Sequence, residues 1–196
     1  MSLRPAPLVR TIREPQRGEV RLIGGAWKRS KLPVLDRPGL RPTPDRVRET
    51  LFNWLGQDLS GWRVLDAFAG TGALGLEAAS RGAAEVLLLE RDALLVAQIS
   101  AVARRLGAQG LRVQREDALS WMARCPAQCF ELVFIDPPFD SDMAVPATAA
   151  AVRLLVPGGY VFVEAGLALD QPPPGVIARR SLRAGAVFGH LWQRDE

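Results

Sequence analysis

From residue 62 onwards the sequence alternates short apolar runs with stretches of helical periodicity, and this alternation is the strongest constraint on the fold. The pattern is typical of right-handed βαβ units, which build a parallel sheet with helices on both faces. Two apolar stretches near the C-terminus have no helical pattern between them, so they predict an antiparallel hairpin that completes the sheet. We expect strands at 63–68, 85–89, 111–115, 130–135, 160–163, 176–183 and 186–193, and helices at about 73–81, 92–106, 117–124 and 143–155.

The first 58 residues follow a different pattern. Residues 1–18 contain three prolines and four arginines without periodicity, so we expect a flexible basic leader. Short apolar pieces around Gly24-Gly25 predict a small β-hairpin within 19–35. A helix is expected to follow, with Thr43 as its N-cap and Pro44 at its first position. We therefore divide the chain into the leader 1–18, a hairpin-and-helix extension 19–58 and an α/β domain 59–196.

Charge is spread unevenly along the chain. Residues 1–48 hold 12 Lys or Arg against 4 acids, whereas the remaining 148 residues hold 13 against 17. A basic segment on a mildly acidic body favours a polyanionic partner, although arginines also occur wherever solvent accepts them.

Composition excludes several other classes. One histidine, His190, and two cysteines, Cys125 and Cys129, cannot form a multi-histidine metal site or a disulfide framework, so we expect no metal. No apolar run reaches the roughly 18 residues of a membrane span, and no signal peptide is evident. We expect a soluble, cytoplasmic protein without a membrane partner.

A glycine-rich turn closes the first strand of the α/β domain. Gly70, Gly72 and Gly75 have the spacing of a dinucleotide turn, in which the backbone bends tightly and approaches its ligand without an intervening Cβ. Glu90 ends the next strand, where a carboxylate can accept both hydroxyls of a ribose. Two ligand classes fit these residues: a nicotinamide or flavin dinucleotide, and S-adenosyl-L-methionine.

An acid at the mouth of the turn favours the second class. Asp66 would repel a pyrophosphate at the helix start, whereas it would attract the ammonium and sulfonium groups of S-adenosyl-L-methionine. Its alternative role is to cap the glycine loop through backbone amides. Asp117, after the third strand, can accept an adenine amine or simply cap its helix. The candidate donor-binding residues are Asp66, Phe68, Gly70, Gly72, Glu90, Arg91, Asp117, Ala118 and Asp136.

The strand at 130–135 ends in Asp136, Pro137, Pro138 and Phe139, which are the candidate catalytic residues. The prolines remove two N–H donors, so the Asp136 carboxylate and the Pro137 carbonyl remain as acceptors. These acceptors suit an exocyclic amine on a flat ring, and Phe139 can stack on that ring. The alternative is a tight turn with a buried aromatic side chain.

Residues 21–139 resemble the bacterial methyltransferases that modify the N2 amine of a guanine in 16S ribosomal RNA. The resemblance is carried by residues 21–28, 40–55, 65–78 and 136–139, of which 40–55 is the most specific segment. It implies a Rossmann-like class I methyltransferase sheet, S-adenosyl-L-methionine as methyl donor, and 16S rRNA within a small-subunit particle or assembly intermediate as partner.

With this resemblance, five basic residues and one tryptophan near the N-terminus become candidates for RNA contact. They are Trp27, Lys28, Arg29, Arg41, Arg46 and Arg48, of which Arg41 could instead line the active site. Three rival functions remain. They are methyl transfer to adenine N6 or a protein glutamine, an NAD-dependent oxidoreductase, and an RNA-binding subunit without activity.

Overall fold

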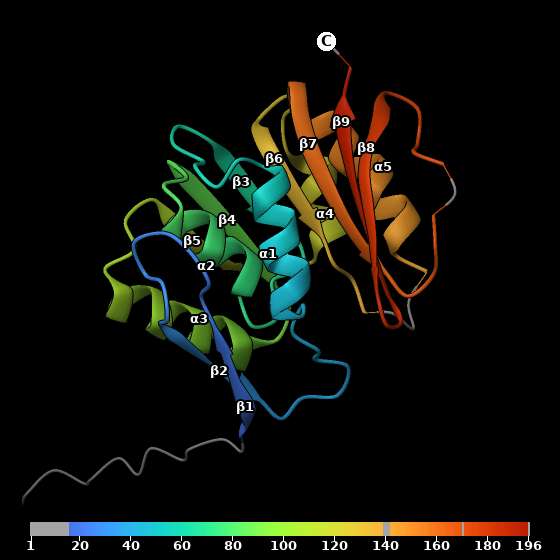
Figure 1. Ribbon diagram of the computed structural model, residues 1–196. Coiled ribbons are helices and arrows are strands. Elements are labelled where there is room, and N and C mark those ends of the chain that lie inside the picture. The colour runs from blue at the N-terminus through green and yellow to red at the C-terminus, as the bar shows by residue number, and fades with distance from the viewer. Residues whose placement is uncertain (1–15, 139–141, 170, 196) are drawn as a thin grey trace, which may run out of the picture.

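The computed structural model describes residues 16–138, 142–169 and 171–195 (Figure 1). Residues 1–15 of the predicted leader lie outside the described residues, and so does Phe139. The strands are β1 Gln16–Arg21, β2 Lys31–Leu35, β3 Arg63–Asp66, β4 Glu85–Glu90, β5 Leu111–Arg115, β6 Phe130–Ile135, β7 Leu155–Ala165, β8 Val176–Ala184 and β9 Val187–Arg194. The helices are α1 Asp45–Trp54, α2 Ala73–Ser80, α3 Ala93–Leu106, α4 Ala118–Arg124 and α5 Ala144–Leu154.

Seven strands form one sheet in the order β5-β4-β3-β6-β7-β9-β8. Strands β3 to β7 pair in parallel, and β9 pairs antiparallel with both β7 and β8. The predicted parallel sheet and its antiparallel end are therefore confirmed. The strand order reverses between β3 and β6, and ligands of such sheets bind outside the carboxyl ends of the strands at this switch point.

Helices cover both faces of the sheet, as predicted (Figure 1). Apolar side chains of α1, α2 and α3 pack on one face around Leu51, Leu76 and Ile99. Those of α4 and α5 pack on the other face around Met122 and Ala151. Among the described residues, no helix combines the length and apolarity that crossing a bilayer requires.

The N-terminal extension packs into the same core as the α/β domain. Strands β1 and β2 form the predicted antiparallel hairpin. Leu22 and Leu32 of this region and Phe52 of α1 are fully buried in one cluster with Val64 of β3 and Leu88 of β4. The chain on either side of residue 58 therefore shares one hydrophobic core.

The predicted start of α1 is wrong in one detail. The helix begins at Asp45, and no side chain caps it. The Thr43 hydroxyl instead donates a hydrogen bond to Asp136 Oδ2 at 3.1 Å. A cap is a local interaction that sequence spacing can indicate, whereas this hydrogen bond depends on the fold.

Candidate active site

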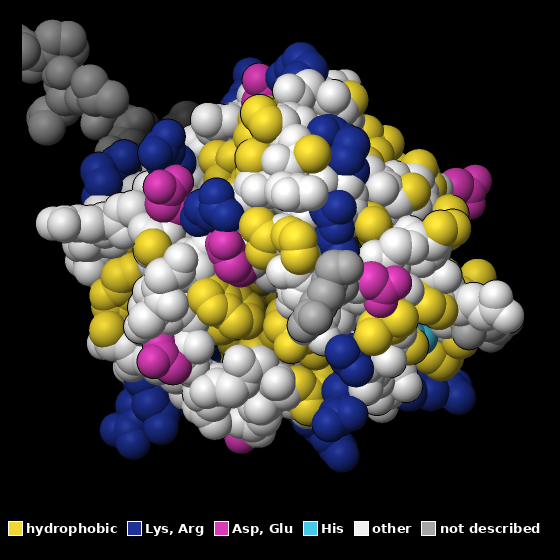
Figure 2. Space-filling view, turned by 90° about the horizontal axis from the view of Figure 1, so that it is seen from above, with side chains coloured by type: hydrophobic (Ala, Val, Ile, Leu, Met, Phe, Trp, Pro, Cys, Tyr) yellow, Lys and Arg dark blue, Asp and Glu magenta, His cyan; other side chains and the backbone are white. Residues whose placement is uncertain are grey.

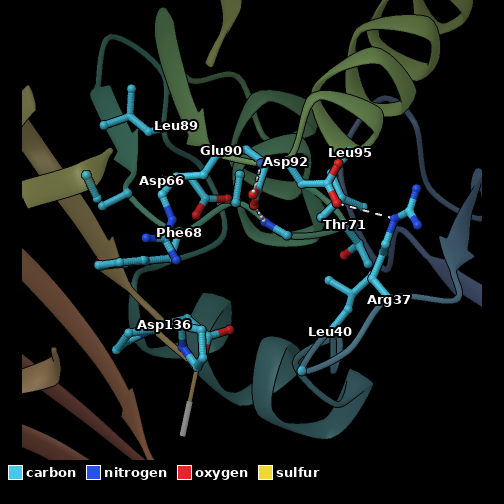
Figure 3. Close-up of a pocket in the computed structure, with 18 of the residues that line it drawn as sticks. Arg37, Leu40, Asp66, Phe68, Thr71, Leu89, Glu90, Asp92, Leu95 and Asp136 are labelled. Atoms are coloured by element: carbon cyan, nitrogen blue, oxygen red, sulfur yellow. Dashed lines mark hydrogen bonds and ion pairs between the residues drawn. The ribbon is translucent and has the colours of Figure 1, made fainter. Parts of the chain in front are cut away.

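A cavity of about 320 Å³ lies at the carboxyl ends of β3, β4, β5 and β6 (Figure 3). This volume falls within the range of small-molecule sites. Figure 3 shows Asp66, Glu90 and Asp136 around the hollow, with Leu40 on another wall. The lining comes from residues 37–43 before α1, the glycine turn and the ends of these strands. Two segments far apart in the sequence thus enclose one space.

Asp66 has the capping role that was its alternative, and it also faces the cavity. Its side chain is almost fully buried, and its Oδ2 accepts a hydrogen bond of 2.9 Å from the Gly75 backbone N–H. It also lines the cavity. Burial is the main cause that raises the pKa of Asp66 to about 7, and the nearby Asp136 and Glu90 raise it further. The carboxyl group therefore changes its charge near neutral pH.

The glycines of the turn are required by the backbone and by close packing. Gly70 and Gly72 have φ angles of 53° and 79°, in the left-handed region that favours glycine. Gly75 lies inside α2, where a Cβ atom would come within 2.8 Å of Leu88 and 3.1 Å of the Asp66 carboxylate. Glycine at this position lets α2 pack directly against β4.

Glu90 fixes the shape of the turn through both of its oxygens. Oε2 accepts a hydrogen bond of 2.9 Å from the Gly70 N–H, and Oε1 accepts one of 2.8 Å from the Asp92 N–H. Asp92 in turn pairs with Arg37 at 3.3 Å, from the segment opposite (Figure 3). Each oxygen of an ionised carboxylate has a second lone pair, so these contacts leave acceptor capacity for a ligand.

Asp117 caps α4, which was its alternative role. Its Oδ1 accepts a hydrogen bond of 2.9 Å from the Ser120 N–H, and this contact is the main cause that lowers the pKa of Asp117. Arg91 lies 3.9 Å from its other oxygen and is well exposed. Phe68, Arg91, Asp117 and Ala118 all line the cavity with the acids described above. All the candidate donor-binding residues except Gly72 therefore line one cavity, and Gly72 lies in the same turn at the N-cap of α2.

Asp136 and the following prolines form the wall at the end of β6. Asp136 is half-buried, Pro137 is buried and Pro138 is exposed. Burial, followed by the charge of Glu164, raises the pKa of Asp136 well above its ordinary value, while the Thr43 hydroxyl opposes this shift. Sequence reasoning missed Glu164, which follows the strand expected at 160–163 and lies in the structure one residue before the end of β7.

Arg48 does not contact solvent, so its predicted role in RNA contact is wrong. Its side chain is fully buried, and its guanidinium lies 2.6 Å from Asp45 and 3.5 Å from Glu77. It also donates a hydrogen bond of 2.9 Å to the Arg21 carbonyl. The contacts tie α1 to the hairpin and to α2, and they leave Arg48 no access to a phosphate.

The other candidates for RNA contact fall into two groups. Arg41 lines the cavity, and Arg46 is exposed in the first turn of α1, next to that segment. Lys28 and Arg29 are exposed in the hairpin turn, and the backbone N–H of Trp27 donates to Ser80 Oγ at the C-terminal end of α2. Because α2 runs from the carboxyl end of β3 back to its amino end, it separates the two groups.

The end of the sheet opposite the cavity has a mixed surface. Figure 2 looks onto this end, where the chain leaves β9 beside the start of β7. Basic, acidic and apolar side chains are interspersed there, and none gathers into a field of one kind. Among the described residues, no three His, Cys, Asp or Glu side chains lie close enough together to hold a metal ion.

Residues 20–192 match the model of a family described as conserved hypothetical protein 95. The chain belongs to this family. Ribosomal RNA small subunit methyltransferase D of Escherichia coli K12 is 41% identical over 186 residues, which is 91% of each protein. The protein of the same name from Haemophilus influenzae is 40% identical over 185 residues, covering 90% of this chain and 95% of that protein.

Two solved structures with the same fold are described as methyltransferases. A putative methyltransferase from Escherichia coli matches with a TM-score of 0.81 at 39% identity, over 91% of this chain and 99% of that chain. A putative methylase from Haemophilus influenzae matches with a TM-score of 0.77 at 34% identity, over 91% and 100%. The Rossmann-like class I methyltransferase fold is therefore confirmed, and the chain is a methyltransferase.

Proposed function

We propose that this methyltransferase transfers a methyl group from S-adenosyl-L-methionine to the exocyclic N2 amine of a guanine in 16S rRNA, within a small-subunit particle or an assembly intermediate. The observation that carries the proposal is the convergence of Asp66, Glu90 and Asp136 on one cavity, in a family whose curated members are named ribosomal RNA small subunit methyltransferase D.

The charge of the cavity fits a cationic donor better than a dinucleotide. Its lining includes three arginines, of which Arg37 and Arg91 each lie within 4 Å of an acid. Six acids oppose them: Asp66, Glu90, Asp92, Glu116, Asp117 and Asp136. A pyrophosphate at the glycine turn would meet Asp66, whereas an ammonium group would be attracted by it. When bound, S-adenosyl-L-methionine supplies an electrophilic methyl group on a positively charged sulfur.

Each donor-binding residue has a task that its position supports. Glu90 offers acceptor capacity to the ribose hydroxyls while it holds the Gly70 N–H. Asp117, with Ala118 beside it, offers an acceptor to the adenine amine. Asp66 attracts the ammonium group. Because its carboxylate is buried, this attraction is stronger than it would be in water.

Asp136 and Pro137 receive the target base. The guanine must leave its stack to reach Asp136 in the cavity, as in other enzymes that modify bases. The Asp136 carboxylate and the Pro137 carbonyl accept the two hydrogens of the amine, which directs the nitrogen lone pair towards the methyl group. Positioning of two reactants can supply about 7–11 kcal/mol, so Asp136 need not be a strong base. Stacking by Phe139 falls outside the described residues and stays a prediction.

The experiment uses the full chain, methyl-labelled S-adenosyl-L-methionine and small-subunit particles that lack the modification. We expect label on N2 of one guanine, located by nuclease digestion and mass spectrometry. Asp136→Ala should lower kcat by at least about a hundredfold, because the amine loses its main acceptor. Its affinity for S-adenosylhomocysteine should change little. Glu85→Ala, at the exposed start of β4, is the matched control.

Three results would contradict the proposal. Label on adenine N6 would identify a different base, and label on a glutamine amide of a ribosomal protein would identify a different substrate class. Near-normal turnover by Asp136→Ala would remove the role given to this carboxylate.

A further inference from the structure

The C-terminal part of the chain is basic and has no acid to balance it. Residues 171–194 contain four arginines and neither Asp nor Glu. One of them, Arg194, is partly buried and donates to backbone carbonyls. The other three, Arg179, Arg180 and Arg183, are exposed on β8, which is an edge strand of the sheet. The unbalanced positive charge therefore lies along one open edge.

Neutral groups hold Arg180 and Arg183 in place. Arg180 Nη1 donates a hydrogen bond of 3.0 Å to the Arg179 carbonyl. Arg183 Nε donates one of 3.2 Å to the Gly185 carbonyl, and its guanidinium lies 5.0 Å from the centre of the Phe188 ring. Within the described parts of the chain, neither forms an ion pair with a carboxylate. A guanidinium group has several N–H donors, so both side chains keep donors for an anion.

The turn between β8 and β9 lies at the same end of the sheet as the cavity. Strand β9 runs antiparallel to both β7 and β8, so β8 points in the same direction as the central strands. Figure 1 shows this turn at the end of the molecule where α1 begins. Helix α1 packs against β8, and Arg46 is exposed in its first turn. The basic edge is therefore continuous with a surface already considered for RNA contact.

The strand register sets the distance from Arg183 to the site. Glu164 of β7 pairs with Gly189 of β9, which pairs with Leu182 of β8, the residue before Arg183. Asp136 is level with Glu164 on the next strand. Neighbouring strands are about 4.8 Å apart, so three steps separate the two backbones by about 14 Å. A stacked nucleic-acid strand covers this distance in roughly four nucleotides.

The other edge strand of the sheet has no such excess of positive charge. Strand β5 carries Arg112 and Arg115, but Glu116 and Asp117 follow directly. This edge borders the cavity where Asp117 lines it. Charged side chains of either sign protect an edge strand from pairing with another chain. Edge protection therefore does not explain why every charge on β8 is positive.

We propose that the outer edge of β8, with Arg180 and Arg183, binds the phosphate backbone of the RNA strand next to the target nucleotide. Arginine can donate two hydrogen bonds to one phosphate, and such contacts position a strand without reading its bases. The edge holds neighbouring nucleotides while the target base reaches Asp136. The inference rests on the proposed function, since that function supplies the RNA strand.

The test measures how tightly the full chain binds small-subunit particles that lack the modification, over a series of salt concentrations. In the double variant Arg180→Ala/Arg183→Ala, Kd should rise at least about tenfold at low salt, because two phosphate contacts are lost. The slope of log K against log salt should fall by about two. Lysine at both positions keeps the charge and should restore the slope.

The matched control is Arg104→Ala/Arg112→Ala, which removes two exposed arginines near the opposite edge of the sheet. Its Kd should stay within about twofold of the original value, and its slope should not change. An unchanged slope in Arg180→Ala/Arg183→Ala would overturn the proposal. An equal fall of the slope in the control would also overturn it, since the effect would then not belong to β8.

A charge-reversed variant separates RNA contact from edge protection. Arg180→Glu/Arg183→Glu keeps the edge charged but repels phosphate, so it should bind the particles more weakly than the alanine variant. Binding as tight as that of the original chain would assign the arginines to edge protection alone. S-adenosylhomocysteine should raise the Tm of this variant and of the original chain equally, which shows that the variant is folded.

A short single-stranded oligouridylate separates this inference from the proposed function. It contains no guanine, and phosphate contacts do not depend on the base. If the particles were bound but no guanine were methylated, the proposed function would fail, while the salt slopes with the oligouridylate would still test β8. Equal slopes for the original chain and the alanine variant with both probes would overturn the proposed surface even if methylation were intact.

Discussion

The Thr43 hydroxyl lies 3.1 Å from Asp136 Oδ2, and this hydrogen bond joins residues that are 93 positions apart. Thr43 belongs to the segment that leads from the hairpin into α1, and Asp136 ends a central strand of the sheet. The segment 37–43 also lines the cavity. The N-terminal extension therefore contributes directly to the site.

Asp66→Asn should stabilise the ligand-free chain and weaken its binding of donor. The pKa of Asp66 is about 7 in the folded chain and 3.8 in the unfolded chain. As the pH rises, Asp66 therefore loses its proton at a lower pH in the unfolded chain. The native fold consequently loses stability as the pH rises from about 4 to about 7. Asparagine keeps the acceptor for the Gly75 N–H and removes this loss.

At pH 8 we expect Asp66→Asn to gain about 1–2 kcal/mol, or about 2–8 °C in Tm, and at pH 4 to match the original chain. Differential scanning calorimetry at both pH values measures the gain. Affinity for S-adenosyl-L-methionine should fall about tenfold by titration calorimetry, because one attractive charge is lost. Equal Tm values at pH 8 would contradict the raised pKa.

S-adenosylhomocysteine should raise the Tm of the chain, whereas NAD should not. The cavity acids suit an amino-acid ammonium and oppose a pyrophosphate. A ligand at a hundredfold excess over its Kd stabilises the folded state by about 2.7 kcal/mol, which a thermal-shift assay detects readily. A shift with NAD alone would restore the oxidoreductase hypothesis.

Glu77→Ala should destabilise the chain strongly although Glu77 lies outside the cavity. Its fully buried carboxylate pairs with Arg81 at 2.8 Å and Arg48 at 3.5 Å, and accepts a hydrogen bond of 2.8 Å from the Ile23 N–H. Removal leaves two buried guanidinium groups short of a partner, at a cost of about 3–5 kcal/mol. Urea unfolding should show this loss as a lower midpoint.

The control for this variant is Glu19→Ala, which removes a solvent-exposed pair with Lys31 at 2.8 Å. Its midpoint should stay close to that of the original chain, because exposed ion pairs contribute little. Similar losses in the two variants would show that burial of the Glu77 network does not matter.

Arg46→Ala should weaken binding to the small-subunit particle and reduce its dependence on salt. Arg46 is exposed beside the segment that lines the cavity, so it is placed to contact a phosphate. Loss of one phosphate contact lowers the slope of log K against log salt by about one. Arg104→Ala, exposed near the far end of α3, should leave the slope unchanged. Equal slopes for all three chains would remove Arg46 from the interface.

Most of the α/β architecture could be predicted from the sequence because its signals are local. Apolar runs, the glycine spacing and the change to a hairpin near residue 176 each reflect residues close together in the chain. The rule that parallel strands present their carboxyl ends together was enough to place Asp66, Glu90 and Asp136 near one another. The cavity that they line agrees with that expectation.

The errors and omissions concern contacts between distant segments. Arg48 has the spacing of an exposed helical position, and only the fold brings Glu77 against it. Thr43 has the sequence context of a helix cap, but its hydroxyl donates a hydrogen bond to Asp136 instead. Glu164 follows a strand expected from the sequence, yet its burial became evident only in the folded sheet. Periodicity carries no information about such partners.

The shared core of the extension and the sheet has a practical consequence for protein engineering. Leu22, Leu32 and Phe52 fill the same apolar cluster as Val64 and Leu88, and the linking segment closes one side of the cavity. Residues 16–58 therefore cannot be transplanted onto another scaffold without breaking up this core. A chimaera would expose buried surface and lose the hydrogen bond from Thr43 to Asp136, so redesign has to proceed side chain by side chain on the outer surface.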